Sequence, residues 1–360
     1  MNDANHMRHA LSLAARALGQ VAPNPAVGCV IVGANGNVIG GGWTQPGGRP
    51  HAETVALAGA GGGACGGTAY VTLEPCAHLG QTPPCADALI AAGVARVVAA
   101  VEDPDPRVRG KGFARLRTAG VEVSVGVLQK EAARLNAGFF LRIEKDRPLV
   151  TLKIAQSADG KTIPPRGASQ WITGEDARRF AHLLRAQHDA ILIGVATAIA
   201  DDPELTCRLP GLENRFPIRI ILDTHLRLPV SAKLVRTARR IPTIMFTTRD
   251  GGDHLQAHGV EVLRVMHDAG GRPALEAMLG VLAGRGCTRL LVEGGPAVWS
   301  AFLRERLADR LEVFTAPAIL GEAAAGDVPV LADQISTGKF EPTGKRMFGP
   351  DLLESYVATA

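Results

Sequence analysis

Strand-type and helix-type segments alternate along this chain in two successive series, and this alternation limits the possible fold more than any other feature. In each series, short apolar runs rich in β-branched residues are followed by amphipathic stretches, which predicts α/β sheets with helices on their faces. The charged stretch RIEKDRP (142–148) interrupts the alternation, and 360 residues exceed what one ordinary core needs. We therefore expect two α/β domains, over residues 1–146 and 147–360.

The individual elements follow from periodicity and from turn residues. A helix is expected at the start, where apolar residues from Met7 to Leu18 follow helical spacing, and the glycine-rich stretch 58–67 is expected to be a loop. In the first series, strands are expected over 26–32, 37–43, 68–73, 95–101 and 121–127, with helices from about Ala52, over 85–93 and over 113–120. In the second series, strands are expected over 149–155, 189–195, 218–223, 242–248, 288–295 and 310–317, with helices over 174–187, 273–284 and 297–307.

Charge and cysteine content exclude several classes of protein. The net charge is +4, no long run carries one sign, and aromatic residues make up 4% of the chain. Because nucleic-acid binders usually show a clustered basic patch and stacking aromatics, a small anionic substrate is the better expectation. Six cysteines in 360 residues are too few for a disulfide scaffold. The sequence also lacks a signal-peptide pattern and a bilayer-length apolar run, so we expect a cytoplasmic protein that binds neither nucleic acid nor membrane.

A histidine, a glutamate and two cysteines form the strongest candidate site. His51 and Glu53 stand in PHAE, where a helix is expected to begin, and Cys76 and Cys85 stand in EPCAHLGQTPPC, after an expected strand. Three nitrogen or sulfur ligands with water in the fourth position are typical of a catalytic zinc ion, which lowers the pKa of that water. Glu53 would then move a proton from the water to a leaving amine. The combination of H-x-E with P-C is a signature of zinc-dependent nucleobase deaminases.

A purely structural zinc site remains an alternative. It would need a fourth ligand, which His78 could supply, but it would leave Glu53 without a role. The two cysteines are separated by eight residues, whereas the usual deaminase signature has two. We expect this insert to lie beside the metal and to shape the pocket.

Taken together, several motifs resemble the bifunctional deaminase/reductase family of riboflavin biosynthesis. APNPAVGCVIV, PHAE and VTLEPCAHLGQTPPC are similar to its first domain, and LKIAQSADGKT, SQWIT, LLRAQHDAILIGVATAIADDPELTCR and LLVEGGP to its second, in the family's order. The resemblance implies a cytidine-deaminase-like three-layer α/β/α domain followed by a dihydrofolate-reductase-like α/β domain. It also implies one zinc ion per chain, NADPH as cofactor, and a homodimer or homotetramer.

The reactions implied by this resemblance act on a phosphorylated pyrimidine. The first is hydrolytic deamination of 2,5-diamino-6-ribosylamino-4(3H)-pyrimidinone 5′-phosphate. The second is NADPH-dependent reduction of the ribosyl chain, giving 5-amino-6-ribitylaminouracil 5′-phosphate. In the deaminase domain, Glu53 would carry the proton, Asn24 would hold the pyrimidine, and His78 and the loop around Asp103 would approach the sugar phosphate.

For the reductase domain the resemblance implies two groups of residues, with Lys153 and Asp201 placed around the reducing sugar. The implied substrate contacts are Lys153, Ser169, Arg185, Leu205, Arg208 and Glu293. The implied cofactor contacts are Ala155, Trp171, Thr197, Asp201, Thr224 and the run Gly295, Pro296, Ala297, Val298, Trp299, Ser300 and Ala301.

Physical chemistry supports part of this second site. Gly294 and Gly295 lead from a strand into a helix, where the backbone can approach a phosphate, although a tight turn alone explains two glycines equally well. The run is not the G-x-G-x-x-G dinucleotide motif. Arg185 and Arg208 could clamp a phosphate, although each taken alone is also typical of a solvated surface arginine.

Three positions depart from the family pattern. Ala158 stands where leucine is expected, Lys161 where arginine is common, and Asp105 where asparagine is usual. A carboxylate beside a substrate phosphate would repel it unless the side chain points away.

Two other functions remain open. A nucleic-acid base deaminase with an appended domain would need a basic face, and the low aromatic content and the eight-residue insert argue against it. A non-enzymatic, zinc-stabilised module with one or both sites inactive is the second, and the intact set His51, Glu53, Cys76 and Cys85 argues against it for the first domain.

Overall fold

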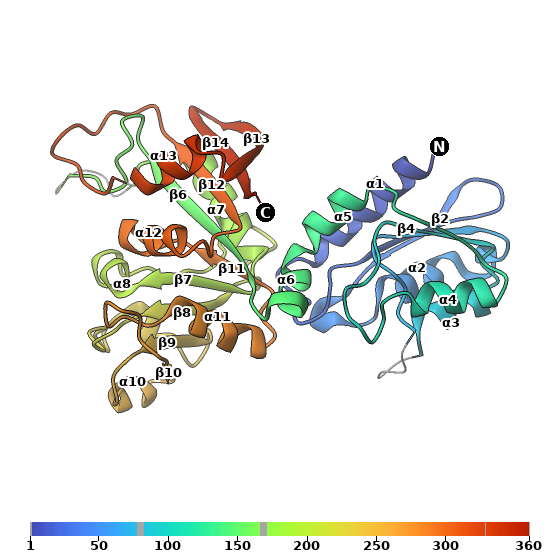
Figure 1. Cartoon of the computed structure of the whole chain (residues 1–360), viewed down its shortest axis with the longest axis horizontal. Helices are drawn as coiled ribbons and strands as arrows, with labels where there is room; N and C mark the ends of the chain where they lie inside the picture. Colours follow the sequence, from blue (N-terminus) through green and yellow to red (C-terminus); the bar gives the residue numbers. More distant parts are fainter. Residues whose placement is uncertain (1, 78–82, 166–170, 328, 360) are drawn as a thin grey trace. The chain divides into compact units, whose positions relative to one another are not determined.

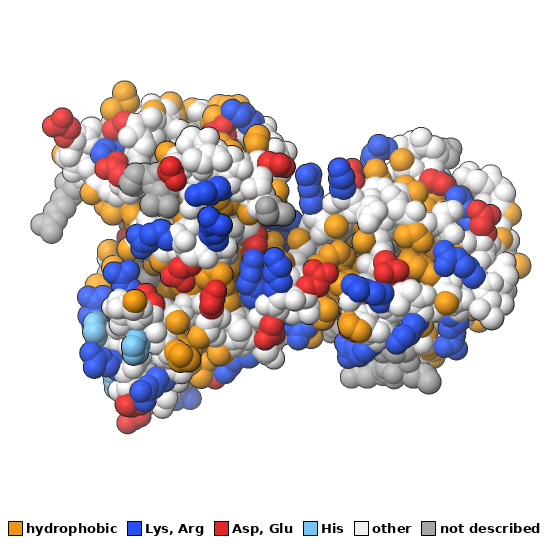
Figure 2. Space-filling view, in the orientation of Figure 1, with side chains coloured by type: hydrophobic (Ala, Val, Ile, Leu, Met, Phe, Trp, Pro, Cys, Tyr) orange, Lys and Arg blue, Asp and Glu red, His pale blue; other side chains and the backbone are white. Residues whose placement is uncertain are grey.

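The chain divides into two compact units, Met1–Asp146 and Arg147–Ala360, which we describe separately (Figure 1). Our structure is a computed structural model that describes residues 2–77, 83–165, 171–327 and 329–359. Within these ranges, no helix has both the length and the apolar character needed to cross a membrane. On the face shown in Figure 2, basic and acidic side chains are interspersed over both units.

The first unit is built on a five-stranded sheet. Its strands are β1 (Gly28–Val32), β2 (Val38–Trp43), β3 (Thr68–Val71), β4 (Arg96–Ala99) and β5 (Glu122–Val125). Their order in the sheet is β2-β1-β3-β4-β5; β1 runs antiparallel to β2 and β3, and β3, β4 and β5 are parallel. Each parallel connection crosses over through a helix, as such connections generally must.

Helices cover both faces of this sheet, as the sequence predicts. They are α1 (Asp3–Ala14), α2 (Ala52–Ala60), α3 (Cys85–Ala91), α4 (Lys111–Thr118), α5 (Gln129–Leu135) and α6 (Ala137–Lys145). In Figure 1, α1 and α5 lie on one face of the sheet, and α2, α3 and α4 lie on the other. The result is a three-layer α/β/α unit whose core contains the fully buried strand residues Val30 and Val98.

Two glycines of β2 allow α2 to approach the sheet closely. A Cβ atom on Gly40 would lie 2.2 Å from the carbonyl oxygen of Ala56, and one on Gly42 would lie 2.4 Å from that of Ala52. Both distances are below van der Waals contact, so only glycine fits at these positions. This approach places the first turn of α2, with Glu53, directly against the sheet.

The expectation of a loop over 58–67 is wrong for its first half. Helix α2 continues to Ala60, and a 3₁₀ turn follows over Gly61–Ala64. Packing of α2 against β2 outweighs the low helix propensity of glycine here. Helices α5 and α6 were also not predicted, and α6 reaches Lys145, inside the charged stretch where we expected an interruption.

The second unit is built on a nine-stranded sheet. Its strands are β6 (Leu149–Gln156), β7 (Ala190–Gly194), β8 (Ile218–Leu222), β9 (Thr243–Thr247), β10 (Glu261–Arg264), β11 (Arg289–Val292), β12 (Arg310–Thr315), β13 (Phe340–Phe348) and β14 (Asp351–Ala358). They lie in the order β10-β9-β8-β7-β11-β6-β12-β14-β13. All neighbours are parallel except for β14, which runs antiparallel to both β12 and β13.

The buried strands of this unit divide their side chains between two cores. Along β7, Ala190 and Leu192 belong to the core that contains residues of α11 and α12, whereas Ile191 and Ile193 belong to the core that contains residues of α7 and α8. This alternation follows from the two-residue period of a strand. The helices are α7 (Glu175–Ala186), α8 (Val195–Asp201), α9 (Lys233–Arg236), α10 (Asp253–Gln256), α11 (Leu275–Gly284), α12 (Pro296–Arg304) and α13 (Pro329–Ser336).

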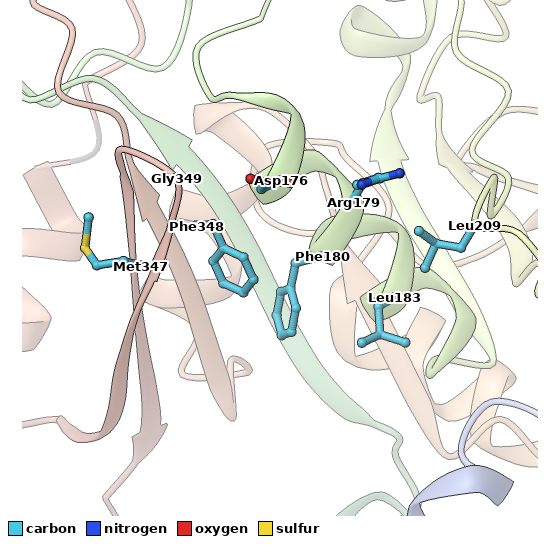
Figure 3. A pocket seen from close by; sticks show the side chains of 8 residues that line it. All are labelled: Asp176, Arg179, Phe180, Leu183, Leu209, Met347, Phe348 and Gly349. Atoms are coloured by element: carbon cyan, nitrogen blue, oxygen red, sulfur yellow. The ribbon is translucent and has the colours of Figure 1, made fainter.

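A hollow of about 380 Å³ lies between α7 and the turn that joins β13 to β14 (Figure 3). The rings of Phe180 and Phe348 stand side by side there, with centroids 4.8 Å apart. The residues that line it are Asp176, Arg179, Phe180, Leu183, Leu209, Met347, Phe348 and Gly349. None of them is a site residue predicted from the sequence, so the hollow coincides with neither predicted active site.

The buried His188 makes the stability of this unit depend on pH. Its Nδ1 lies 2.6 Å from the carbonyl oxygen of Leu184 and its Nε2 lies 3.0 Å from the hydroxyl of Thr151. A carbonyl only accepts, so Nδ1 carries the proton and Nε2 accepts from Thr151. Burial, together with the nearby Arg289, lowers the pKa of His188 to about 3.

We therefore expect acid to destabilise the second unit through this residue. Between pH 7 and pH 5 the unfolded chain takes up a proton that the folded unit excludes, which costs about 2 kcal/mol of stability from this residue. In His188→Gln the loss over the same interval should be smaller by about that amount. Hydrogen exchange of the buried β7 amides measures the free energy of unfolding. If this free energy has the same pH dependence in the wild type and in His188→Gln, His188 is not the source of the acid sensitivity.

Candidate active sites

Three metal-binding side chains meet where α2 and α3 begin. His51 is the residue that precedes α2, Cys85 is the first residue of α3, and Cys76 follows β3. The Nδ1 atom of His51 lies 3.3 Å from the sulfur of Cys85 and 3.7 Å from the sulfur of Cys76. The three candidate ligand atoms all lie within 4.8 Å of one another.

This spacing fits a tetrahedral zinc ion. With Zn–N and Zn–S bonds of ordinary length, nitrogen and sulfur ligands are about 3.6 Å apart. The thiol of Cys85, the ring of His51 and the Cys85 amide, which donates to the Cys76 sulfur at 3.3 Å, together lower the pKa of Cys76 to about 4. The pKa of Cys85 is raised, because its thiol hydrogen-bonds to Cys76 and because it is buried. A divalent cation would allow both sulfurs to ionise, so the donor set suits zinc.

Glu53 lies beside this cluster in the first turn of α2. Its side chain is buried, at 3% exposure. Burial and the negative charge of Cys76 raise the pKa of Glu53 to about 7, although His51 opposes the shift. A carboxyl group with this pKa takes up or releases a proton near neutral pH, which is the property a proton shuttle needs.

The structure brings Asn24 next to the segment that leads into His51. Gly48 has a φ of +87°, and a Cβ atom there would lie 1.9 Å from the side-chain nitrogen of Asn24. Gly48 lies three residues before His51, and only glycine at this position leaves room for the Asn24 amide. His78 lies outside the described residues, so its predicted role has no structural counterpart here.

Glu74 organises the loop that carries Asp103, and sequence reasoning assigned it no role. Its buried carboxylate accepts hydrogen bonds from the amides of Gly110 and Gly112, each at 2.9 Å, and also from those of Asp103 and Phe113, each at 3.3 Å. Four amides around one carboxylate fix the conformation of a loop more than 25 residues downstream. The only local signal is a glutamate before the Pro-Cys pair, which says nothing about its partners.

The two aspartates of the DPDP loop have different surroundings. Asp103 and Asp105 are both buried, at 6% exposure each. Burial and the neighbouring Asp105 raise the pKa of Asp103 to about 6. Asp105 pairs with Arg107, with Nε to Oδ2 at 2.9 Å. The charge of the unusual aspartate is thus largely offset within the loop.

The predicted reductase residues gather at the carboxyl ends of parallel strands. Lys153 and Ala155 are on β6, Glu293 follows β11, Thr197 and Asp201 are on α8 after β7, and Thr224 follows β8. Clefts in open α/β sheets form at this edge. The run Gly295 to Ala301 covers the residue before α12 and its first turns.

The starts of α8 and α12 lie close together at this edge. A Cβ atom on Gly295 would lie 3.5 Å from the hydroxyl of Thr197, and one on Gly194 would lie 3.0 Å from Val298. Main-chain amides at a helix start favour a phosphate. Trp299, however, is 6% exposed and belongs to the apolar core, so cofactor contact at that position would come from the main chain.

Arg185 and Glu293 form a buried ion pair within the predicted substrate site. Arg185 donates two hydrogen bonds to the carboxylate of Glu293, from Nε at 2.7 Å and from Nη2 at 2.9 Å. Both side chains are largely buried. Burial alone would raise the pKa of Glu293, but Arg185 and Lys153 lower it to about 2. The expectation that Arg185 and Arg208 together clamp a phosphate needs correction, because the fork of Arg185 is occupied by Glu293, whereas Arg208 is exposed.

The other predicted reductase positions that the structure describes do not join this ion pair. Trp171 is 54% exposed, with the guanidinium of Arg178 5.0 Å from its ring centre. Leu205 is buried, so only its main chain could contact a substrate. Lys161 pairs with Asp327 at 2.9 Å. Ser169 lies outside the described residues.

Two family models match the two halves of the chain. The model described as "RibD C-terminal domain" matches residues 148–353. The model described as "Cytidine and deoxycytidylate deaminase zinc-binding region" matches residues 1–101, which include the cluster of His51, Cys76 and Cys85.

Full-length relatives are similar in sequence and in structure. The chain is 46% identical to the riboflavin biosynthesis protein RibD of Aquifex aeolicus, over 91% of each chain, and 41% identical to that of Escherichia coli, over 98% of each. The structure of Acinetobacter baumannii RibD superimposes with a TM-score of 0.87 at 38% identity over 99% of both chains. A Thermotoga maritima structure, titled as a diaminohydroxyphosphoribosylaminopyrimidine deaminase/5-amino-6-(5-phosphoribosylamino)uracil reductase, gives a TM-score of 0.87 at 35% identity over 99% of both. These likenesses confirm the predicted fold class.

Proposed function

The chain belongs to the RibD family of riboflavin-biosynthesis enzymes, and from this premise we propose how its residues divide two reactions between its two units. It is a bifunctional deaminase and reductase that uses zinc and NADPH. We assign deamination to Met1–Asp146 and reduction to Arg147–Ala360. The substrates we propose are the ones named above for the family, a phosphorylated diaminopyrimidine and its deaminated product.

In the deaminase unit, His51, Cys76 and Cys85 would hold the zinc ion, and Glu53 would transfer protons. Zinc, when bound by such ligands, supplies an activated water. Glu53 accepts a proton on its carboxylate and returns it to the departing amine, so that ammonia leaves uncharged. Asn24 orients the pyrimidine through its side-chain amide.

In the reductase unit, main-chain amides at the start of α12, close to Thr197, would bind a phosphate of the cofactor. The cofactor supplies the hydride, and the protein supplies position and charge. Lys153 and the Arg185–Glu293 pair form the polar wall against which the opened sugar lies. The depressed pKa of Lys153, which burial lowers, makes this ammonium a readier proton donor than an ordinary lysine.

The observation that carries the deaminase half is the His51–Cys76–Cys85 cluster with the buried Glu53 beside it. One purified protein should release ammonia from the diaminopyrimidine ribosyl phosphate and then oxidise NADPH with the product. Ammonia release without NADPH oxidation would reject the reductase half, and the reverse would reject the deaminase half.

We expect Cys85→Ser to remove zinc and deamination together. Loss of one thiolate should reduce bound zinc from one per chain to a small fraction, and ammonia release should fall in proportion. NADPH oxidation with supplied deaminated product should stay within about twofold, because Cys85 lies in the other unit. Metal analysis and both assays on one preparation test this.

The exposed Cys65 provides the matched control. Cys65→Ser removes a thiol of the same unit that is not among the candidate zinc ligands. It should keep both zinc and activity. Full zinc content in Cys85→Ser would contradict the assignment of Cys85 as a ligand.

Assembly and location stay predictions. We propose a homodimer or homotetramer that acts on small molecules in the cytoplasm, without nucleic acid or membrane as partner. Sedimentation equilibrium of the purified chain would decide between the oligomers, and a monomer at micromolar concentration would contradict both.

A further inference from the structure

We propose that His182 is a positioning residue of the reductase: it holds the segment Glu204–Arg208 in the shape that binds the phosphorylated substrate. This inference rests on the proposed reductase function. His182 is not among the site residues predicted from the sequence, and it is not part of the Lys153, Arg185 and Glu293 group. Its role follows from hydrogen bonds that join α7 to a strained loop.

Two side chains of α7 lie within hydrogen-bonding distance of the same carbonyl group. The Nδ1 atom of His182 lies 3.0 Å from the main-chain oxygen of Thr206, and Nη1 of Arg185 lies 3.1 Å from that oxygen. His182 and Arg185 are three residues apart, so they lie on one face of the helix. The opposite side of α7, with Phe180, borders the hollow of Figure 3.

The segment Glu204–Arg208 contains a residue with a strained backbone conformation. Leu205 has a φ of +55°, a left-handed conformation that costs a non-glycine residue roughly 1 kcal/mol or more. The side chains of Leu205 and Cys207 are buried, at 3% and 2% exposure, which anchors the segment from within. The contacts of His182 and Arg185 with Thr206 and Arg208 hold this segment from the side of α7.

Two groups of this segment lie at Nδ1 of His182, and each uses a different tautomer of the ring. The Thr206 oxygen only accepts, so Nδ1 donates to it when it carries the proton. The amide of Arg208, 3.3 Å from the same nitrogen, donates to Nδ1 when the proton is on Nε2. In either tautomer His182 therefore holds the segment by one hydrogen bond through Nδ1.

The charge state of His182 agrees with this arrangement. Burial and the adjacent guanidinium groups of Arg185 and Arg208 lower its pKa to about 4. At neutral pH the ring is therefore uncharged and keeps one proton. His182 thus supplies one hydrogen bond to the segment and no charge to the site.

Three variants separate the hydrogen bond at Nδ1 from the rest of the ring. Asparagine places its amide group near the position of Nδ1, whereas glutamine places it near Nε2 and alanine removes it. We expect His182→Ala and His182→Gln to raise the KM for the deaminated product about tenfold, the effect of one lost hydrogen bond of ordinary strength. His182→Asn should stay within about threefold of the wild type.

Other constants should not change. The kcat for reduction should fall less than threefold, and the KM for NADPH and the rate of ammonia release should stay at wild-type values. Arg179→Ala is the matched control, because Arg179 is exposed on the other side of α7, beside the hollow. It should leave the KM for the deaminated product unchanged. An unchanged KM in His182→Ala, or equal KM values for His182→Asn and His182→Gln, would overturn the proposal.

A measurement without turnover keeps the inference separate from the reductase function. In His182→Ala the amides of Cys207 and Arg208 should exchange hydrogen at least tenfold faster, while amides of β7 keep their protection. If the wild type fails to oxidise NADPH with the deaminated product, the proposed function fails, whereas unchanged exchange at these two amides removes the role of His182.

Discussion

Glu53→Gln is expected to reduce ammonia release by roughly 10²- to 10⁴-fold, the contribution typical of a positioned proton-transfer group. Glutamine has nearly the same shape and keeps the packing at the start of α2, but it cannot take up and return a proton. Zinc content should stay at one per chain, because Glu53 is not among the ligand atoms that meet at the metal cluster. NADPH oxidation with supplied deaminated product should remain at the wild-type rate.

A carboxylate of the same unit serves as the control for this variant. Glu131 is exposed in the first turn of α5, so Glu131→Gln should leave both reactions unchanged. If Glu53→Gln loses zinc together with activity, its role is to support the metal and not to transfer protons. If both reactions fail in a folded protein, the two sites are not independent.

Glu293→Gln is expected to destabilise the second unit by about 3–5 kcal/mol, because it leaves the guanidinium of Arg185 buried without its partner charge. Both side chains of the pair have low exposure, 15% for Arg185 and 10% for Glu293. Reduction should be lost along with stability, since the polar wall of the site loses its negative charge. Urea unfolding at pH 7 measures the first effect, and NADPH oxidation at low temperature, where the variant remains folded, measures the second.

A second buried ion pair in the same unit separates stability from function. Arg147 and Asp309 are joined at 2.7 Å with exposures of 16% and 17%, and neither is among the predicted site residues. Asp309→Asn should therefore cost stability of similar size but keep kcat/KM in the folded fraction. Equal losses of kcat/KM in the two variants would show that Glu293 acts only through folding.

Regular elements with one-sided or fully buried patterns were predictable from the sequence. Strand β6 was expected over 149–155 and covers Leu149–Gln156, and β7 was expected over 189–195 and covers Ala190–Gly194. Both are buried runs rich in β-branched residues, so burial on two faces is written into their composition. The same reasoning led to the layered α/β architecture.

Elements that depend on neighbours were missed. Along β13 most side chains are exposed, and no apolar alternation marks it, so its pairing with β14 gives it its conformation. The glycine-rich end of α2 is helical because the glycines of β2 allow close packing. Local propensity predicts neither case.

The metal site could be predicted because its chemistry depends on residue type and short spacing. Imidazole and thiol groups bind zinc wherever a fold collects them, and the two-residue step from His51 to Glu53 at the start of a helix sets their relation locally. For the other site, the tertiary structure decided the outcome. Arg185 meets Glu293 across 108 residues of sequence, and Glu74 holds amides at least 29 residues away. An arginine's partner depends on which groups the fold brings within 3 Å and removes from water, and no local pattern encodes that distance.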